Sequence, residues 1–361
     1  MEKKLRVAVL GGTGMVGQRF ISLLENHPWF TVTTIAASPR SAGKTYEEAV
    51  ADRWKLESPM PEAVKNLVVK NVNEVEAVSA DVDFTFSAVD MSKDEIRAIE
   101  EAYAKAETPV VSNNSAHRWT PDVPMVVPEL NPQHFDIIPD QKKRLGTNNG
   151  FIAVKPNCSI QSYTPALTAW MDFEPYEVVA STYQAISGAG KTFREWPEME
   201  GNIIPFINGE EEKSEKEPLK IWGHIENGEI VPAASPKITC QCIRVPILNG
   251  HTAAAFVKFR KKATKEELIE ALQSFSGEPQ KLALPSAPKQ FIQYFTEDDR
   301  PQVAKDVDYE RGMGISIGRL REDTIYDWKF VGLSHNTLRG AAGGAVLSAE
   351  LLKAKGYLHE K

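Results

Sequence analysis

The sequence predicts an α/β protein whose first half is a doubly wound domain on a parallel sheet and whose second half is an α+β domain with a mostly antiparallel sheet. Two observations support this class: apolar strands alternate with amphipathic helices over the first half, and strands follow one another with few helices between them later. At 361 residues the chain also exceeds one ordinary domain. We therefore expect one domain over residues 1–157, a second over 158–335, and a C-terminal helix over 336–361 that returns to the first domain.

The first strand and the turn after it indicate what the first domain binds. Residues Leu5–Leu10 form an apolar run, Gly11, Gly14 and Gly17 follow in a G-x-x-G-x-x-G pattern, and an amphipathic helix extends to about Asn26. In such a unit the backbone can approach a pyrophosphate, which the helix N-terminus then stabilises. The pattern predicts a Rossmann-like, dinucleotide-binding domain.

The loop after the second strand indicates which dinucleotide binds. The strand over residues 31–37 leads into a loop that contains Ser38, Arg40, Ser41 and Lys44 but no carboxylate. A carboxylate here would hold the ribose 2′-hydroxyl of NAD, whereas a guanidinium can pair with the 2′-phosphate of NADP. We expect NADP as the cofactor; the alternative is an ordinary solvated basic loop.

Two further strand ends in this half carry polar residues. A buried strand over residues 83–89 contains Ser87 near its end, a helix covers about 93–106, and the strand 109–112 leads into a polar loop with Arg118. Ligands of open α/β sheets bind beyond the carboxyl ends of the strands, so Ser87 and Arg118 are candidate contacts. On spacing alone, a plain surface arginine is the commoner case.

Cys158 is the candidate nucleophile. It follows a buried strand over residues 151–154 and a Pro-Asn break, and it precedes a helix predicted from about Ser159 to Met171. The unpaired N–H groups and the dipole of a helix N-terminus stabilise an anion, so this thiol is expected to ionise more easily than a free one. The alternative is a buried, inert cysteine, as most free cysteines are.

The second half is predicted to be rich in strands. They are expected at about 176–185, 239–245, 251–259, 314–320 and 326–332. Asn249-Gly250, between the second and third of these, is typical of a hairpin turn. Small residues over 184–191 let a cofactor ring or a substrate approach the backbone, and small residues in the last helix, 336–355, allow close packing.

Composition excludes several classes of function. A formal net charge of −7 without a Lys/Arg-rich tract gives no footprint for nucleic acid, and no apolar run approaches the roughly 18 residues that span a bilayer. Three cysteines are too few for a disulfide framework, and Cys240 and Cys242 lack the second Cys or His pair of a zinc site. We expect two packing cysteines, no metal and a cytoplasmic protein.

Six motifs follow one another along nearly the whole chain. They are Gly11-Gly-Thr-Gly-Met-Val-Gly17, Ser112-Asn-Asn-Ser-Ala-His-Arg118, Pro156-Asn-Cys-Ser159, Gln184-Ala-Ile-Ser-Gly-Ala-Gly190, Arg244-Val-Pro-Ile-Leu-Asn-Gly-His251 and Ser334-His-Asn-Thr-Leu-Arg-Gly340. Together they resemble the aspartate-β-semialdehyde dehydrogenases, in particular the branch typical of archaea and fungi. The resemblance implies reversible, NADP-dependent reduction of L-4-aspartyl phosphate to L-aspartate 4-semialdehyde through a cysteine thioester, in the biosynthesis of lysine, threonine, methionine and isoleucine. It also implies a homodimer or homotetramer that associates through the second domain.

The resemblance further implies roles for individual residues. Cys158 is the nucleophile, Gln184 orients the reacting group, and His251, with an unperturbed pKa of about 6.5, suits the general acid/base. The substrate-binding residues implied are Arg244 for the α-carboxylate, Glu210 or its neighbour Glu211 for the ammonium, and Arg118, Lys213 and Asn157 for the phosphate. The cofactor-binding residues expected are Gly11, Thr13, Gly14, Met15, Val16, Ser38, Arg40, Ser41, Ser87, Ser187, Gly188 and Asn336. Without the resemblance, the Glu/Lys run over 210–217 is more simply a solvated helix end.

Three alternatives remain open from the sequence. A homologous reductase of a CoA thioester such as malonyl-CoA would share the fold, NADP and the cysteine, but would need CoA instead of phosphate. A cysteine hydrolase built on Cys158 and His251 leaves the glycine turn unexplained. A non-catalytic NADP sensor would use Cys158 only for packing.

Overall fold

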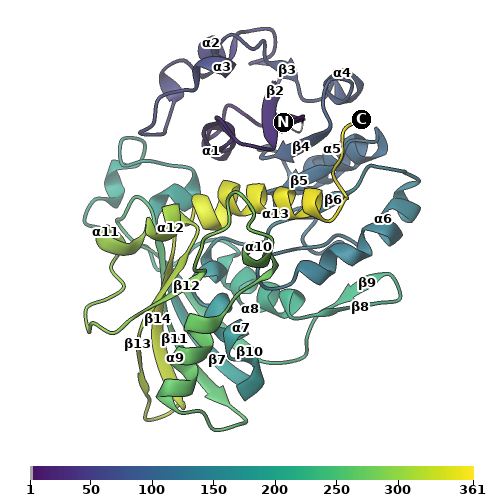
Figure 1. The fold of residues 1–361 in the computed structure, drawn as a ribbon. Helices are drawn as coiled ribbons and strands as arrows, with labels where there is room; N and C mark the ends of the chain where they lie inside the picture. Colours follow the sequence, from purple (N-terminus) through teal and green to yellow (C-terminus); the bar gives the residue numbers. More distant parts are fainter. Residues whose placement is uncertain (1–2) are drawn as a thin grey trace.

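The structure, a computed structural model, describes residues 3–361. Two six-stranded sheets lie one beyond the other, and the C-terminal helix α13 (Gly343–Ala354) runs between them (Figure 1). The strands of the first sheet fall within residues 5–154 and those of the second within 175–334. The expected domain limits at 157 and 335 stay predictions.

The first sheet is parallel throughout, in the order β3-β2-β1-β4-β5-β6. Its strands are β1 (Leu5–Leu10), β2 (Phe30–Ala37), β3 (Lys70–Asn71), β4 (Phe84–Ser87), β5 (Val110–Ser112) and β6 (Ile152–Val154). Its helices are α1 (Met15–Leu24), α2 (Tyr46–Val50), α3 (Glu62–Lys65), α4 (Val75–Ser79), α5 (Lys93–Lys105) and α6 (Ile138–Leu145). The doubly wound prediction is confirmed.

The register of this sheet brings several carboxyl ends to one edge. Leu10 pairs with Ser87, Ser87 with Ser112, and Ser112 with Val154, so the segments that follow these strands start side by side. The turn after β1 needs glycine: Gly11 has φ +77°, and a Cβ there would lie 2.3 Å from the carbonyl oxygen of Ala88. The glycine motif and the Cys158 segment therefore leave the same edge of the sheet.

The second sheet is mixed, in the order β10-β7-β11-β14-β13-β12. Its strands are β7 (Pro175–Gln184), β10 (Lys237–Arg244), β11 (His251–Phe259), β12 (Ile292–Phe295), β13 (Ile315–Glu322) and β14 (Trp328–Ser334). The three central pairings are antiparallel and the two outer ones are parallel, which agrees with the mostly antiparallel sheet expected. The other elements of this half are α7 (Thr164–Ala169), α8 (Glu210–Ile221), the ribbon β8 (His224–Glu226) and β9 (Glu229–Val231), α9 (Lys265–Ser274), α10 (Glu278–Lys281), α11 (Val303–Asp306) and α12 (Tyr309–Gly312).

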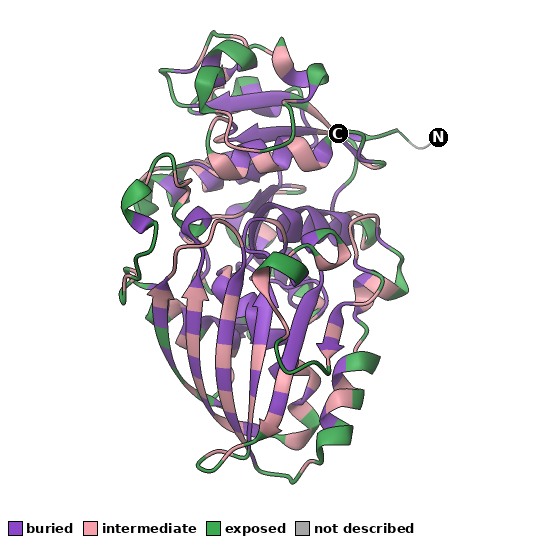
Figure 2. Cartoon of the chain, turned by 90° about the vertical axis from the view of Figure 1, so that its left-hand side faces the viewer, coloured by how far each residue is buried: buried purple, intermediate pink, exposed green. Residues whose placement is uncertain are grey.

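The two faces of the second sheet differ in burial. Along β11 every second residue from His251 to Phe259 is buried and the residues between are intermediate, so stripes of both classes cross the strands in Figure 2. On the buried side Trp170 packs edge-on against Phe259 and Phe330. The opposite face is half-exposed.

The predicted helix over 159–171 is wrong in its form. The segment contains a 3₁₀ turn over Ser159–Ser162, the short helix α7, and a second 3₁₀ turn over Met171–Phe173. Pro165 explains the break, because proline carries no N–H and is accommodated only in the first turn of a new helix. Cys158 thus precedes a single tight turn and not a long helix.

The predicted hairpin at Asn249-Gly250 is also wrong. β10 and β11 do not pair: β7 lies between them, parallel to β10 and antiparallel to β11. The connection crosses the end of β7, where the N–H groups of Ile186 and Ser187 donate to the carbonyls of Ile247 and Leu248. The chain does bend at Asn249, and Gly250 has a positive φ of 100°. However, the strands on either side of this bend each pair with β7 and not with each other.

The C-terminal segment begins later as a helix than expected. Residues Leu338–Ala342 form a π-type turn, and α13 follows at Gly343. Ten consecutive residues of α13, from Gly343 to Leu352, are buried, and the helix contacts α1 and β5. Arg339 in the π-type turn is 1% exposed and donates to both carboxylate oxygens of Glu129, at 2.9 and 2.7 Å.

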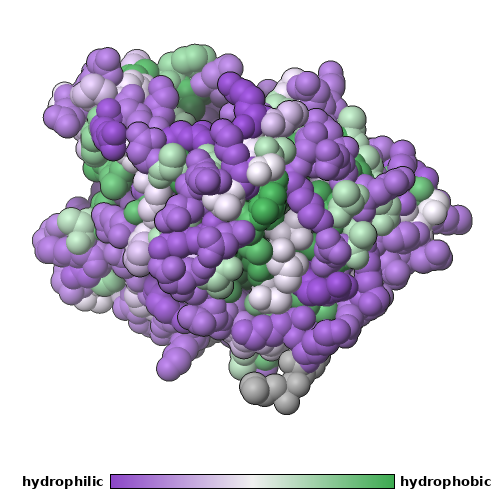
Figure 3. All heavy atoms as spheres, turned by 90° about the horizontal axis from the view of Figure 1, so that it is seen from above, coloured by the Kyte–Doolittle hydropathy of each residue, from purple (hydrophilic) through white to green (hydrophobic). Residues whose placement is uncertain are grey.

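The face of the molecule seen from above is mainly hydrophilic and has a central strip of more hydrophobic residues (Figure 3). Within residues 3–361 no helix combines the length and hydropathy that crossing a membrane requires.

The Arg339–Glu129 pair predicts a large stability effect. Arg339→Met leaves the Glu129 carboxylate buried without its partner, and breaking such a pair costs about 3–5 kcal/mol. Urea unfolding should show this loss, whereas Lys216→Met, which removes an exposed ion pair with Glu212, should cost much less, because an exposed pair contributes little to stability. The double variant Arg339→Met/Glu129→Met should recover part of the loss. A cost for Arg339→Met no larger than that for Lys216→Met would contradict the assignment.

Candidate active site

Cys158 and His251 meet at the junction of the two sheets. Cys158 follows β6 on the carboxyl edge of the first sheet, and His251 is the first residue of β11 in the second. The Cys158 Sγ lies 3.4 Å from the His251 Nε2. Gly340 allows this placement, because a Cβ there would lie 2.7 Å from the Cβ of Cys158. The sequence prediction that these two residues form one site is supported by this contact.

The sequence suggested that the Cys158 thiol ionises more easily than a free thiol. The structure contradicts this expectation. Cys158 keeps some exposure, but protein surrounds its sulfur, and burial raises the pKa of the thiol above its ordinary value. The Glu210 carboxylate acts in the same direction. Lys155, Arg118 and Arg244 oppose the increase in part. The expected effect of a helix dipole fails because the following turn has only four residues.

His251 is held in one orientation by the backbone. Its Nδ1 accepts a hydrogen bond from the Ala185 N–H at 3.1 Å, so the proton of the neutral ring sits on Nε2, facing the sulfur. Burial, together with the nearby Arg244 guanidinium, lowers the pKa of His251 to about 3. The imidazole is therefore neutral near pH 7, and it is a hydrogen-bond donor to sulfur and not the base that the unperturbed pKa suggested.

Glu210 joins several of the predicted residues. Its carboxylate accepts from Asn157 Nδ2 at 3.1 and 2.9 Å, from Lys213 Nζ at 2.8 Å and from Gln184 Nε2 at 3.4 Å. Burial acts to raise the pKa of Glu210, but Lys213 and Asn157 outweigh it and the pKa falls below its usual value. The neighbouring Glu211 instead accepts from the backbone N–H of Cys242, so of the two glutamates Glu210 faces the site.

Arg244 and Gln184 come to the site through the register of the second sheet. They are paired residues at the ends of β10 and β7, and His251 starts the next strand. Arg244 is buried and donates to the carbonyl of Ala185 at 2.6 Å. A Cβ at Gly188 would lie 2.9 Å from an Arg244 nitrogen and 3.1 Å from the His251 ring, so this glycine makes room for both side chains.

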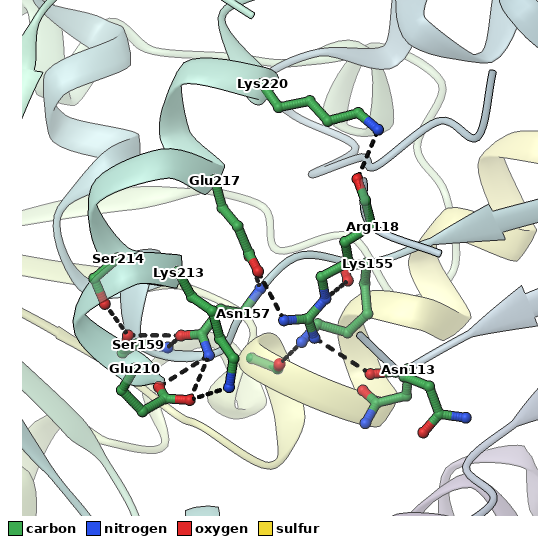
Figure 4. A network of polar contacts seen from close by, with 12 residues as sticks. Asn113, Arg118, Lys155, Asn157, Ser159, Glu210, Lys213, Ser214, Glu217 and Lys220 are labelled. Carbon is green, nitrogen blue, oxygen red and sulfur yellow. Dashed lines mark hydrogen bonds and ion pairs between the residues drawn. The ribbon is translucent and has the colours of Figure 1, made fainter. Parts of the chain in front are cut away.

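Arg118 is buried, not a surface arginine. Its guanidinium donates to the carbonyl of Lys155, to Glu217 at 2.9 Å and to the carbonyl of Asn113 (Figure 4). Glu217, which the sequence analysis missed, also accepts from the Asn157 N–H at 2.5 Å. One carboxylate thus fixes both the arginine and the residue before the nucleophile.

The helix α8 presents these groups along one face. Glu210, Lys213, Ser214, Glu217 and Lys220 recur at intervals of three and four residues. In Figure 4, Glu210, Ser214 and Glu217 point toward Asn157 and Ser159, on either side of Cys158, whereas Lys220 points toward Arg118. Lys220, also missed, donates to the carbonyls of Arg118, Thr120 and Val123 and so ties down the Arg118 loop. The spacing was a usable signal, but the density of charge favoured a solvated helix end, which the structure contradicts.

A cleft of about 580 Å³ opens beside the glycine turn. Of the predicted cofactor residues it is lined by Gly11, Thr13, Gly14, Ser38, Arg40 and Ser41. Lys44, Arg53 and Lys55 add positive charge to its wall. Two carboxylates, Asp90 and Glu195, also line the cleft, and Glu195 is paired with Lys55 at 2.7 Å. A glycine-lined cleft with several cations suits a dinucleotide that carries an additional phosphate.

The remaining predicted cofactor residues lie outside this cleft. Met15 and Ser187 line a second cleft of about 390 Å³. Asn336 follows β14 and connects two loops of the second half, since its Nδ2 donates to Ser187 and its Oδ1 accepts from the Gly250 N–H. Ser87 is buried and accepts from Asn114, Gly188 packs near Arg244, and Val16 lies in the first turn of α1.

The described residues 3–361 hold no group of three or more His, Cys, Asp or Glu side chains arranged for a metal ion. Cys240 and Cys242 are buried on β10 with their sulfurs 3.8 Å apart, as packing residues.

Comparisons with known proteins agree with this arrangement. Residues 6–138 match the semialdehyde dehydrogenase NAD-binding domain, and residues 167–339 match the semialdehyde dehydrogenase dimerisation domain. The chain is 43% identical to an aspartate-semialdehyde dehydrogenase of Methanothermobacter thermautotrophicus, over 96% of this chain and 99% of that one. It is 40% identical to one of Aspergillus fumigatus, over 98% and 99%. The crystal structure of the Candida albicans aspartate-semialdehyde dehydrogenase with NADP superposes with a TM-score of 0.88 at 37% identity, covering 99% and 100% of the two chains.

The position of Glu210 predicts how the thiol titrates. Glu210→Gln removes a negative charge that raises the pKa of Cys158, so that pKa should fall by about one unit and alkylation of Cys158 by iodoacetamide below neutral pH should be roughly tenfold faster. The rate is followed by mass spectrometry of the Cys158 peptide across a pH series. Glu212→Gln on the same helix is the control, since Glu212 is exposed and pairs with Lys216. A slower reaction of the Glu210 variant would show that Glu210 does not act on the sulfur.

Proposed function

Because this chain belongs to the aspartate-semialdehyde dehydrogenase family, we propose that it catalyses the reversible, NADP-dependent reduction of L-4-aspartyl phosphate to L-aspartate 4-semialdehyde, with release of phosphate. The observation that carries the proposal is the 3.4 Å contact between the Cys158 Sγ and the His251 Nε2 inside a ring of buried ionic side chains. The neighbouring cleft lies on the same sheet edge as Cys158.

Cys158 is the nucleophile in this scheme. As a thiolate it attacks the carbonyl carbon of the acyl phosphate, and an S–C bond forms. The C–O bond to phosphate breaks, phosphate leaves, and the acyl group remains on Cys158 as a thioester. NADPH, when bound, supplies the hydride that reduces the thioester carbon. The C–S bond then breaks, which releases the aldehyde and returns the thiolate.

His251 assists as a donor. With Nδ1 occupied by the Ala185 N–H, its Nε2–H can stabilise the thiolate before attack and can donate to negative charge that develops on the reacting oxygen. Gln184 carries a neutral amide held at 3.1 Å from Thr182, so it can orient the reacting group without altering the charge around the sulfur.

The substrate carries a carboxylate, an ammonium and a phosphate, and the site offers a partner for each. Arg244 suits the α-carboxylate, because a planar guanidinium can bind two oxygens at once. Glu210 suits the ammonium. The phosphate is assigned to Arg118, Lys213 and Asn157. In Figure 4, Lys213 and Asn157 lie beside Glu210, and Arg118 lies beside Glu217.

The cofactor would be held by the glycine turn and the basic wall of the first cleft. Gly11, Thr13 and Gly14 would contact the pyrophosphate, and Ser38, Arg40 and Ser41 would contact the 2′-phosphate. For the nicotinamide end we assign Ser187, Gly188 and Asn336, with Met15, Val16 and Ser87 lining the passage between. The Ser187–Asn336 hydrogen bond and the nearness of Gly188 to His251 support this assignment.

The assembly is proposed to be a homodimer or a homotetramer. The half-exposed face of the second sheet, crossed by β7 and β11, lies within the residues that match a dimerisation domain. We also propose the division into 1–157, 158–335 and 336–361, and a role in lysine, threonine, methionine and isoleucine biosynthesis.

The proposal is tested with the reverse reaction. Purified protein should reduce NADP, followed by absorbance, when given L-aspartate 4-semialdehyde and phosphate, and Cys158→Ala should abolish this activity because no thioester can form. The melting-temperature shift caused by NADP should change little in that variant. Cys240→Ala, a packing cysteine, is the matched control. Activity that requires CoA in place of phosphate would favour the thioester reductase, and turnover retained by Cys158→Ala would refute the mechanism.

Arg244→Lys should separate binding from chemistry. A lysine keeps the charge but loses the two-oxygen geometry, so KM for the semialdehyde should rise by about tenfold or more while kcat changes less. Lys237→Arg, at the exposed start of the same strand, is the control. An unchanged KM in the Arg244 variant would remove this residue from the carboxylate site.

A further inference from the structure

Lys155 is a buried cation that the proposed mechanism does not use. It follows β6 directly, is 3% exposed, and donates from its Nζ to the carbonyl oxygen of Gly340. Within residues 3–361 no carboxylate lies within ion-pair distance of this ammonium. Figure 4 shows it directed at the C-terminal segment and away from Glu217. A charge in such a place is costly to bury without an opposite charge nearby.

The surroundings of Lys155 are charged on several sides. The groups that act on it are Arg118 from the loop after β5, Cys158 from its own segment, and Glu217 and Glu210 from α8, while the Arg339–Glu129 pair lies beyond Gly340. Burial, together with the nearby Arg118 guanidinium, lowers the pKa of Lys155 to about 7. The two carboxylates are already occupied, Glu217 by Arg118 and Glu210 by Lys213. The ammonium therefore lacks an anion of its own.

Gly340 connects Lys155 to the nucleophile. Its carbonyl accepts from the Lys155 Nζ, and its Cα faces Cys158 so closely that a Cβ would lie 2.7 Å from the Cys158 Cβ and 3.1 Å from its Cα. The ammonium and the thiol thus lie on opposite sides of one glycine residue. The anion that forms beside this glycine during the reaction is the thiolate of Cys158.

The other candidates for a counter-charge are weaker. His251 is neutral near pH 7 and its Nδ1 faces an N–H group, so an imidazolium is disfavoured. Arg118 is already paired with Glu217. Arg244 acts on the sulfur but is assigned to the substrate carboxylate, which would compete for its charge.

We propose that Lys155 is a positioning residue whose ammonium supplies the positive charge that stabilises the Cys158 thiolate, while its bond to Gly340 fixes the backbone against which the sulfur packs. The inference rests on the proposed function in one respect, namely that Cys158 reacts as a thiolate. The nearby charges support it, because Lys155 acts to lower the pKa of Cys158 and Cys158 acts to raise that of Lys155.

The test measures the thiol and not turnover. Rates of Cys158 alkylation by iodoacetamide are followed over a pH series in the full-length protein, with the peptide identified by mass spectrometry. Lys155→Met should raise the apparent pKa of the thiol by about one to three units, as removal of a nearby opposite charge does. Lys155→Arg, which keeps a permanent charge, should leave that pKa unchanged or lower it.

Lys220→Met is the matched control, because Lys220 is a second buried lysine of the same network that bonds to three backbone carbonyls. Its variant should leave the thiol pKa near the wild-type value. An equal shift in both methionine variants, no shift in Lys155→Met, or a raised pKa in Lys155→Arg would overturn the proposal. If Lys155→Met does not fold, the arginine variant decides.

This result is independent of the proposed reaction. Wild-type protein that shows the expected thiol shifts but no phosphate-dependent turnover of the semialdehyde would refute the function and leave the role of Lys155 standing. Turnover with no shift in Lys155→Met would do the reverse.

Discussion

The geometry of the site depends on how two carboxylates of α8 hold Asn157. Glu217 accepts from its backbone N–H and Glu210 from its side-chain amide, while the Asn157 Oδ1 accepts from the N–H and hydroxyl of Ser159. Cys158 lies between these two anchored residues, so its backbone has little freedom. Rigid placement matters because a nucleophile displaced by an ångström loses much of the advantage of proximity. The short 3₁₀ turn can serve here because side chains, and not a long helix, determine where the sulfur lies.

The same carboxylates create an electrostatic problem, which the surrounding cations resolve. Burial and Glu210 both disfavour a thiolate, yet the reaction requires one. Each glutamate is therefore paired, Glu217 with Arg118 and Glu210 with Lys213, which limits the field that reaches the sulfur. His251 adds a hydrogen bond without adding charge. The thiolate of Cys158 exists only briefly during the reaction. The positive charge that stabilises it then comes from groups that have no permanent anionic partner.

Much of the fold was predictable because its signals are local. The glycine turn at Gly11, the alternation of strand and helix in the first half, and the Cys158 motif depend on short-range patterns. Five of the six strands of the first sheet were expected close to their observed places, whereas the two-residue strand β3 was not. The hairpin at Asn249-Gly250 failed because the insertion of β7 between the two strands is decided by tertiary contacts. The helix over 159–171 failed for a local reason, because Pro165 interrupts it. Lys220 could not be identified from sequence, since a lysine in a charged run looks solvated until three carbonyls are seen around it.

The two halves of the protein are joined where the reaction would take place. Lys55 of the first half reaches the carbonyl of Gly190 at 2.8 Å as well as Glu195, while Asn336 links Ser187 to Gly250 on the side of the second sheet. These bonds connect the wall of the dinucleotide cleft to the turn that carries Gly188, against which Arg244 and His251 pack. A cofactor bound in the cleft would therefore contact groups that also fix the imidazole. Cofactor binding and the placement of His251 therefore both depend on the short turn that carries Gly188. For this reason neither sheet alone could form the site.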